Sequence, residues 1–247
     1  MARQYQNPPL VEAVCEFRFQ ASASWDMAMP GLIYQKLRGE YPKRRPARTY
    51  ETQVKETEQG IQQQLVQRDS LHFLSEDEKV LVQISPHLLA VSHFVPYPGW
   101  NGYRPIIEQA LAAYQEVASP NGIARVGLRY INRVVFDSER VDLEEYFEFY
   151  PFVGKRLPDD FNSFMVGIEV ARSDARDFLR LQMTTGSPEV PGTVPIIIDL
   201  DFYLGQPGKV EVGEEVDWLE QAHSQLEAAF EGCLRDTARE RFGEVKE

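Results

Sequence analysis

Carboxylates and arginines share one face of three segments whose pattern is that of half-buried strands. The segments are residues 11–19, 125–136 and 194–204, and apolar residues occupy every second position over most of each one. The charged residues predicted on the opposite face are Glu12, Glu16, Arg18, Arg125, Arg129, Arg133, Asp199 and Asp201. Residues of these types suit two tasks, which are ion pairing between neighbouring strands and polar binding of a partner.

Three interpretations of this charged face compete. Opposite charges on neighbouring strands stabilise a sheet by a few tenths to about 1 kcal/mol per pair, so the acids can simply pair with the arginines. Exposed arginines also suit a docking surface for another protein. Asp199 and Asp201 are two residues apart, which places them about 6.5–7 Å from each other, a spacing open to an acid and a base. Nothing else in the sequence supports catalysis, so we expect no catalytic residues.

A second candidate binding feature is the string YPGWNGYRP, residues 97–105, between a predicted strand and a predicted helix. It combines aromatic residues with two glycines and one arginine. Such a loop can present Trp100, Tyr103 and Arg104 to a ligand or partner, or it can cover the end of the core. Both interpretations stay open from the sequence.

Residue types that bind metals or nucleotides form no recognised pattern. His72, His87 and His93 fall within one stretch but lack the spacing of metal-ligand motifs, and neither glycine-rich phosphate-binding motif occurs. Cys15 and Cys233 lie on apolar faces, which favours buried free thiols over a disulfide or a nucleophile. We expect no metal, no cofactor and no enzymatic activity.

The composition is acidic. The 247 residues carry a formal net charge of -12, and this charge opposes the attraction to phosphate on which nucleic-acid binding depends. The one concentrated positive run is KRRPAR, Lys43 to Arg48; we expect it in an exposed loop, the only place where nucleic-acid contact is considered. Because no long apolar run and no leader-like start occur, we expect a cytoplasmic protein without membrane contact.

Periodicity predicts a similar order of elements in the two halves of the chain. The first half contains a strand, a helix capped by Ser24 or Asp26 and ending near Gly39, a polar connection over 43–60, up to four short strands within 62–95 with a turn at 68–70, and a helix over 103–117. The second half contains a long strand, a short helix capped by Asp142, a hairpin over 163–184, a strand over 194–204 and one helix over 216–242.

This repetition predicts an α+β fold built by internal duplication. Residues 1–120 and 121–247 would form two similar halves that share one antiparallel sheet, with the helices on a single face and the whole chain packed as one unit. The first strands of the two halves would then be central neighbours, as in the topology of the TATA-binding protein. That likeness is one of topology and carries no function.

Several strings resemble a known family. PPLVEA near the start, LRYINR in the middle, DLDFY, and a C-terminal helix with the spacing H-x6-F-E are together similar to a sporadically distributed family of uncharacterised bacterial and archaeal proteins of about this length. The resemblance covers essentially the whole chain. It implies no activity or site residues, and the scattered occurrence of the family implies a role in phage defence or a toxin–antitoxin system.

The function that we expect is binding without catalysis. The leading hypothesis is a protein partner held by the open sheet face and the Trp100 loop, with a homodimer as one form of partner. The alternative is a small-molecule or nucleotide sensor whose pocket lies between the sheet and the helices. A bound metabolite favours the second hypothesis, and a stoichiometric protein partner favours the first.

Overall fold

The computed structural model describes residues 3–20, 25–57, 60–158 and 161–245. Within these residues the chain forms nine strands and five helices. In chain order they are β1 (Leu10–Phe19), α1 (Met29–Leu37), β2 (Lys43–Thr57), β3 (Gly60–Leu74), β4 (Val80–Ser85), β5 (Leu88–Phe94), α2 (Trp100–Ala118), β6 (Ile123–Phe136), α3 (Leu143–Tyr146), β7 (Met165–Arg172), β8 (Asp177–Thr185), β9 (Val194–Leu204), α4 (Glu215–Cys233) and α5 (Asp236–Phe242).

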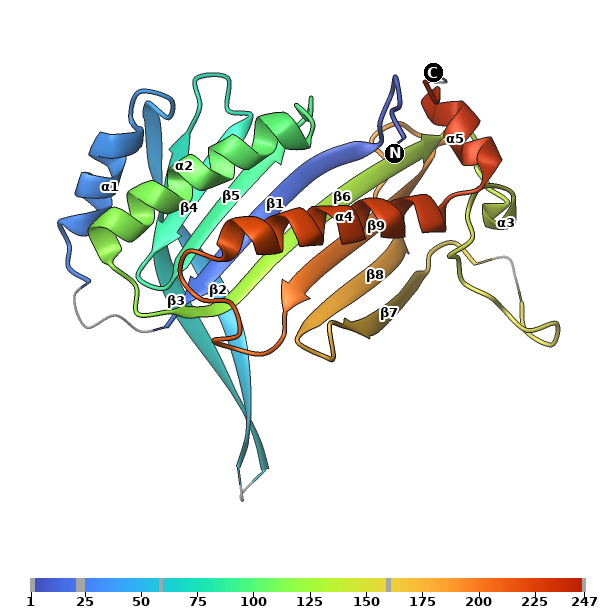
Figure 1. The fold of residues 1–247 in the computed structure, drawn as a ribbon. Coiled ribbons are helices and arrows are strands. Elements are labelled where there is room, and N and C mark those ends of the chain that lie inside the picture. Colours follow the sequence, from blue (N-terminus) through green and yellow to red (C-terminus); the bar gives the residue numbers. More distant parts are fainter. Residues whose placement is uncertain (1–2, 21–24, 58–59, 159–160, 246–247) are drawn as a thin grey trace.

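All nine strands belong to one antiparallel sheet in the order β2-β3-β4-β5-β1-β6-β9-β8-β7. Helices α1, α2 and α4 lie on the same side of this sheet (Figure 1). Helix α2 packs on β5, and α4 packs on β9, β6 and β8. The predicted α+β class with a single antiparallel sheet is therefore confirmed.

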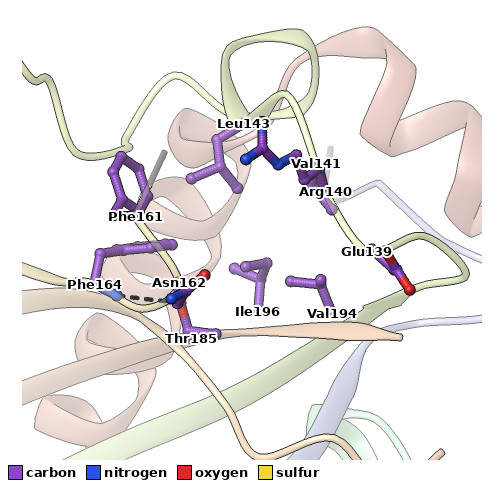
Figure 2. A pocket seen from close by; sticks show the side chains of 10 residues that line it. All are labelled: Glu139, Arg140, Val141, Leu143, Phe161, Asn162, Phe164, Thr185, Val194 and Ile196. Atoms are coloured by element: carbon purple, nitrogen blue, oxygen red, sulfur yellow. Dashed lines mark hydrogen bonds between the residues drawn. The ribbon is translucent and has the colours of Figure 1, made fainter. Parts of the chain in front are cut away.

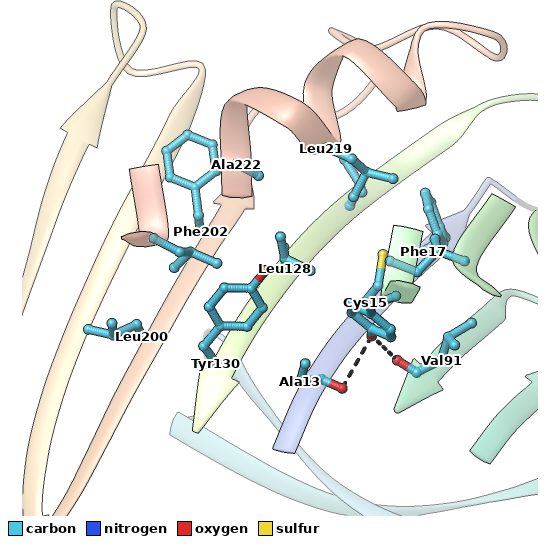
Figure 3. Close-up of a cluster of buried hydrophobic side chains, with 14 of the residues drawn as sticks. Ala13, Cys15, Phe17, Val91, Leu128, Tyr130, Leu200, Phe202, Leu219 and Ala222 are labelled. Atoms are coloured by element: carbon cyan, nitrogen blue, oxygen red, sulfur yellow. Dashed lines mark hydrogen bonds between the residues drawn. The ribbon is translucent and has the colours of Figure 1, made fainter. Parts of the chain in front are cut away.

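Alternation along the central strands decides which face the helices cover. Val126, Leu128 and Tyr130 of β6 are buried, whereas Arg129 between them is exposed. The buried residues of β1, β6 and β9 meet the apolar stripes of α2 and α4 in one core, part of which is shown in Figure 3. Because a strand sends successive side chains to opposite sides, every charged residue predicted on the strand faces lies on the side without these helices.

Residues 43–60 were expected to be an exposed connection, and this expectation is wrong. Lys43–Thr57 is strand β2, which pairs with β3 along its whole length. Strand β3 also runs without a break through the turn expected at 68–70, and only its end, from Leu71, pairs with β4. Most of this two-stranded ribbon extends beyond the rest of the sheet (Figure 1), and the sequence of Lys43–Thr57 lacks the apolar alternation by which a strand is predicted.

The single helix expected over 216–242 is two helices. Leu234 and Arg235, between α4 and α5, have extended backbone. Leu234 is buried and forms a β-bridge with Phe147, and the Arg235 N–H donates to the Tyr146 carbonyl at 2.8 Å. Contacts with the α3 region therefore replace the helical hydrogen bonds at this point, and no local signal in the sequence announces them.

Other local predictions hold. The Asp142 carboxylate accepts the Glu144 N–H at 3.1 Å at the start of α3. Before α1, the Asp26 carboxylate accepts the N–H groups of Ala28 and Met29, while Ser24 lies outside the described residues. In the described part of the chain, no helix is long and apolar enough to cross a membrane.

Asp177 fixes α4 to the sheet. It is fully buried at the start of β8, and its carboxylate accepts the Trp218 indole N–H at 2.9 Å and pairs with Arg176 at 2.6 Å. A buried charge with two donors holds both elements in place, and removing it leaves the Trp218 indole without this acceptor, whereas Arg176 keeps its hydrogen bond to Gln221.

We expect Asp177→Ala to lower the free energy of unfolding by about 1–3 kcal/mol, because the Trp218 indole loses its buried acceptor. Asp217→Ala, an exposed change in the first turn of α4, is the control and should cost at most about 1 kcal/mol. Urea denaturation measures both values. Equal losses in the two variants would show that Asp177 does not fix α4.

Candidate functional site

The charged residues of the open sheet face form a network of ion pairs. Arg125 of β6 lies between Glu16 of β1, at 3.0 Å, and Asp201 of β9, at 3.1 Å. Arg129 of β6 pairs with Asp199 of β9. Within β1, Arg18 pairs with Glu16 at 2.8 Å. The network therefore crosses the three central strands, as expected for opposite charges on neighbouring strands.

The arginines partly cover the carboxylates. The side chains of Asp201 and Asp199 are only 14% and 17% exposed, against 47% for Arg129. The Arg125 guanidinium also lies over the Tyr203 ring at 4.6 Å. Because the acids are matched by arginines, this face is polar but close to neutral, and the simplest interpretation of the pattern, cross-strand pairing, describes its geometry.

Other predicted members lie outside the centre of this network. Arg133 pairs with Glu189 of the loop before β9 at 3.2 Å, and Glu189 is 80% exposed. Glu12 lies opposite Ile131 of β6 and takes part in no ion pair within the described residues. Asp199 and Asp201 each have an arginine partner, so the spacing that suits an acid and a base is here used for structure.

Asp201 shows how two electrostatic effects compete on this face. Burial raises the pKa of Asp201 above its usual value of 3.8, although Arg125, Arg129 and Arg180 each act to lower it. The charged form of Asp201 is thus less favourable in the folded protein than in water.

The Trp100 region connects two helices. The Trp100 indole N–H donates to both carboxylate oxygens of Glu220 on α4, each at 3.1 Å, and its ring stacks on His223 with centroids 4.4 Å apart. Arg104 also pairs with Glu220. Gly99, with φ of 76°, precedes α2 in a backbone conformation that favours glycine and turns the chain into the helix.

Tyr103 is not available to a partner. It is fully buried, and its hydroxyl donates to the carbonyl oxygens of Val91, at 2.6 Å, and Ala13, at 3.2 Å. The expectation that the loop presents Tyr103 at the surface is wrong, because the first turn of α2 directs this side chain onto β1 and β5. Trp100 and Arg104 both belong to α2 and contact Glu220 of α4, so they do not form an open loop.

A cleft of about 850 Å³ lies beside this junction, on the helix side of the sheet. Four parts of the chain line it. They are the segment leading into β1 (Arg3, Gln4, Tyr5, Pro8, Pro9 and Leu10), the turn before α2 and its start (Tyr97, Pro98, Gly99, Trp100 and Asn101), strand β6 (Tyr130 and Asn132), and the second half of α4 (His223, Ser224, Glu227, Ala228, Phe230 and Glu231). The size falls within the range of small-molecule pockets, about 300–1,000 Å³.

A row of hydrogen bonds connects the base of the cleft to its rim. The Tyr130 hydroxyl lies 2.8 Å from His223 Nδ1 and 3.4 Å from the Tyr97 hydroxyl, and His223 Nε2 lies 3.3 Å from the Glu227 carboxylate. Burial raises the pKa of Tyr97 to about 12 and that of Tyr130 well above its usual value. Both phenols therefore stay protonated near neutral pH, where they donate and accept hydrogen bonds but do not act as nucleophiles.

Asn132 is the unusual residue in this cleft. It occupies a core-facing position of β6, between Tyr130 and Val134, and is 4% exposed. Its amide nitrogen donates to the Ile198 carbonyl at 3.3 Å, and its side-chain carbonyl accepts no hydrogen bond from the described residues. This oxygen is not among the fully buried side-chain atoms that lack a partner, so it is an acceptor that solvent or a ligand in the cleft can reach.

The outer wall of the cleft is held by a different set of contacts. The Tyr5 hydroxyl donates to Glu231 at 2.7 Å, and Glu231 also pairs with Arg239 at 3.1 Å. The segment before β1 forms backbone hydrogen bonds with the end of α5, including the Asn7 N–H to the Phe242 carbonyl at 2.9 Å. Contacts with α4 and α5 thus hold in place the N-terminal segment that lines this side of the cleft.

A smaller pocket, shown in Figure 2, lies near the start of β9. Its volume is about 190 Å³, and Phe164, Val194 and Ile196 contribute to its lining. This is below the usual size of ligand pockets, so the cleft beside Trp100 is the better candidate.

Sequence reasoning located the charged face and offered a pocket between the sheet and the helices as an alternative, but of the residues that line the cleft it singled out only Trp100 as a binding residue. Its lining comes from four separate parts of the chain, and His223 and Tyr130 look like packing residues from their periodicity alone. One signal was present: Asn132 interrupts an otherwise apolar row, Val126, Leu128, Tyr130, Val134 and Phe136.

Asp201→Asn tests the electrostatic balance on the sheet face. Because the folded-state pKa of Asp201 is raised, the folded protein binds this proton more tightly than the unfolded chain does, and the contribution of Asp201 to stability falls as pH rises from about 3.8 through the raised value. We expect the free energy of unfolding of the wild type, minus that of the variant, to decrease with pH over this range. Urea denaturation at a series of pH values measures it, with the exposed Asp137→Asn as control. A difference that increases with pH would mean that the arginines outweigh burial.

No protein-family model matches this chain, and no curated protein matches it.

Proposed function

We propose that this chain is a non-enzymatic binding protein whose ligand is a small molecule held in the cleft between the sheet, α2 and α4. The observation that carries the proposal is a cavity of about 850 Å³ at whose base the side-chain carbonyl of Asn132 accepts no hydrogen bond from the described residues. Ligand sites are typically concave, mostly apolar and supplied with a few convergent polar groups. This cleft has that make-up, with Trp100, Tyr130 and Phe230 as its apolar surfaces.

The protonation state of the phenols and of the Cys15 thiol favours a binding role over catalysis. The phenols of Tyr97 and Tyr130 remain protonated, as argued above, and burial raises the pKa of the Cys15 thiol well above its usual value. A nucleophile needs the opposite shift. The sensor hypothesis drawn from the sequence is therefore the one that we place first.

Filling the cleft tests this proposal. Ala228 is exposed and lines the cleft from α4, and Ala112 is exposed on α2 outside the lining. We expect that a compound found in a metabolite screen to raise the melting temperature of the wild type also does so for Ala112→Trp, but not for Ala228→Trp. At a concentration of about 100 Kd, binding adds about 2.7 kcal/mol, and a chain of this size gains about 2–4 °C per kcal/mol.

Differential scanning fluorimetry measures these shifts, and circular dichroism confirms that both tryptophan variants fold. Compounds that stabilise Ala228→Trp as well as they stabilise the wild type would place the binding site elsewhere.

The open sheet face is the second candidate site, for a protein partner. The observation in its favour is that none of α1, α2 and α4 covers this face (Figure 1), and that Arg129 and Arg18 remain about half exposed despite their ion pairs. Glu16 and Asp201 would supply further polar contacts. The same surface would serve a homodimer.

Arg129→Glu combined with Arg133→Glu separates docking from simple ion pairing. If the face docks a partner, the double variant loses the partner in a tagged pull-down from the native host while its melting temperature changes little. If the pairs are only structural, the double variant loses stability, because the carboxylate introduced by Arg129→Glu would face Asp199 directly. A pull-down with no stoichiometric protein would contradict the docking role.

We further infer an internal duplication of residues 1–120 and 121–247. The sheet order supports it, since β1 and β6 are central neighbours and each is flanked by the last strand of its own half, β5 and β9. The same order supports the proposed topological likeness to the TATA-binding protein. Membership of the sporadic family, a cytoplasmic location and a role in phage defence or a toxin–antitoxin system remain proposals that rest on the sequence.

A further inference from the structure

Building on the proposed ligand site, we propose that the cleft binds a small organic molecule that carries a protonated amine. The ammonium group would donate hydrogen bonds to the Asn132 carbonyl or the Glu227 carboxylate, and the organic body would lie against the aromatic side chains. Three independent features of the cleft lead to this ligand class.

The first feature is an acceptor at the base of the cleft. The Asn132 amide nitrogen already donates to a backbone carbonyl, which leaves its side-chain oxygen to accept. The Trp100 indole N–H is used by Glu220. A ligand that donates hydrogen bonds therefore completes the base of the cleft, whereas one that only accepts leaves the side-chain oxygen of Asn132 unsatisfied.

The second feature is the charge of Glu227. Of the two carboxylates in the lining, Glu231 is neutralised by Arg239 and lies near Arg3. Glu227 has no arginine or lysine partner within the described residues, and its one ionic contact is with His223. A cation would supply the missing counter-charge. The overall charge of -12 also favours cationic over anionic ligands during approach.

The third feature is the aromatic lining. Tyr97, Trp100, Tyr130 and Phe230 all contribute to the cleft. Aromatic faces attract ammonium groups through the negative charge density of the ring, and tryptophan does so best. The same rings bury the apolar body of a ligand. An amine with an aromatic or aliphatic body therefore finds both of its parts matched in one cavity.

Three probes that share a phenyl ring with a two-carbon chain, but differ in the charge of the end group, test this inference. They are 2-phenylethylamine, which is cationic at neutral pH, the neutral 2-phenylethanol, and the anionic phenylacetate. Titrations followed by protein NMR should give the amine at least about tenfold tighter binding than the alcohol, and the anion the weakest. Glu227→Gln keeps the shape of the side chain and removes its charge, so it should reduce this preference for the amine. Glu189→Gln, an exposed change outside the cleft lining, should leave the preference unchanged.

The outcomes separate the ligand class from the site itself. Tighter binding of the amine that Glu227→Gln weakens and Ala228→Trp abolishes supports the inference. If the alcohol or the anion binds as tightly as the amine and Ala228→Trp still blocks it, the cleft is a ligand site but the amine preference is wrong. If the amine causes no shifts at the cleft at millimolar concentration, the inference is overturned, and the metabolite screen then decides on the site independently.

Discussion

The pairing of β1 with β6 is the interaction on which the rest of the structure depends. It joins the first strand of each half along most of its length and places the two at the centre of the sheet. Because both strands turn their apolar residues to the same side, both long helices must pack on that side. Helix α2 lies on β5 and α4 lies on β9 and β6. The charged side chains are left on the other face, where they satisfy one another.

The cleft follows from the way in which α2 and α4 meet. Gln115 near the end of α2 reaches Glu215 at the start of α4, and Trp100 at the start of α2 reaches His223 in the middle of α4. The second half of α4 therefore continues past the start of α2. The segment before β1 occupies the remaining side, and Tyr130 and Asn132 of β6 form the base. Glu220 helps to hold this geometry, since its carboxylate accepts hydrogen bonds from both Trp100 and Arg104 of α2.

The sequence was most informative where one physical rule acts alone. Alternation in β1, β6 and β9 predicted which residues are buried and which are charged partners, because a packed face imposes its period on a strand. The rule gave nothing for Lys43–Thr57, a strand whose sequence does not alternate, or for the break at Leu234, where contacts with the α3 region outweigh helix propensity. The cleft combines four distant parts of the chain, and only the out-of-pattern Asn132 marked it.

A crystallographic fragment screen tests the central claim, that the cleft is the binding site, most directly. Crystals of the intact chain would be soaked with small fragments that include amines, alcohols and carboxylates. The claim predicts that fragments collect in the cleft beside Trp100, with a donor group against the Asn132 carbonyl and amines the most frequent class. A cleft that holds only water in every data set, while fragments bind the open sheet face or other surfaces, would contradict it.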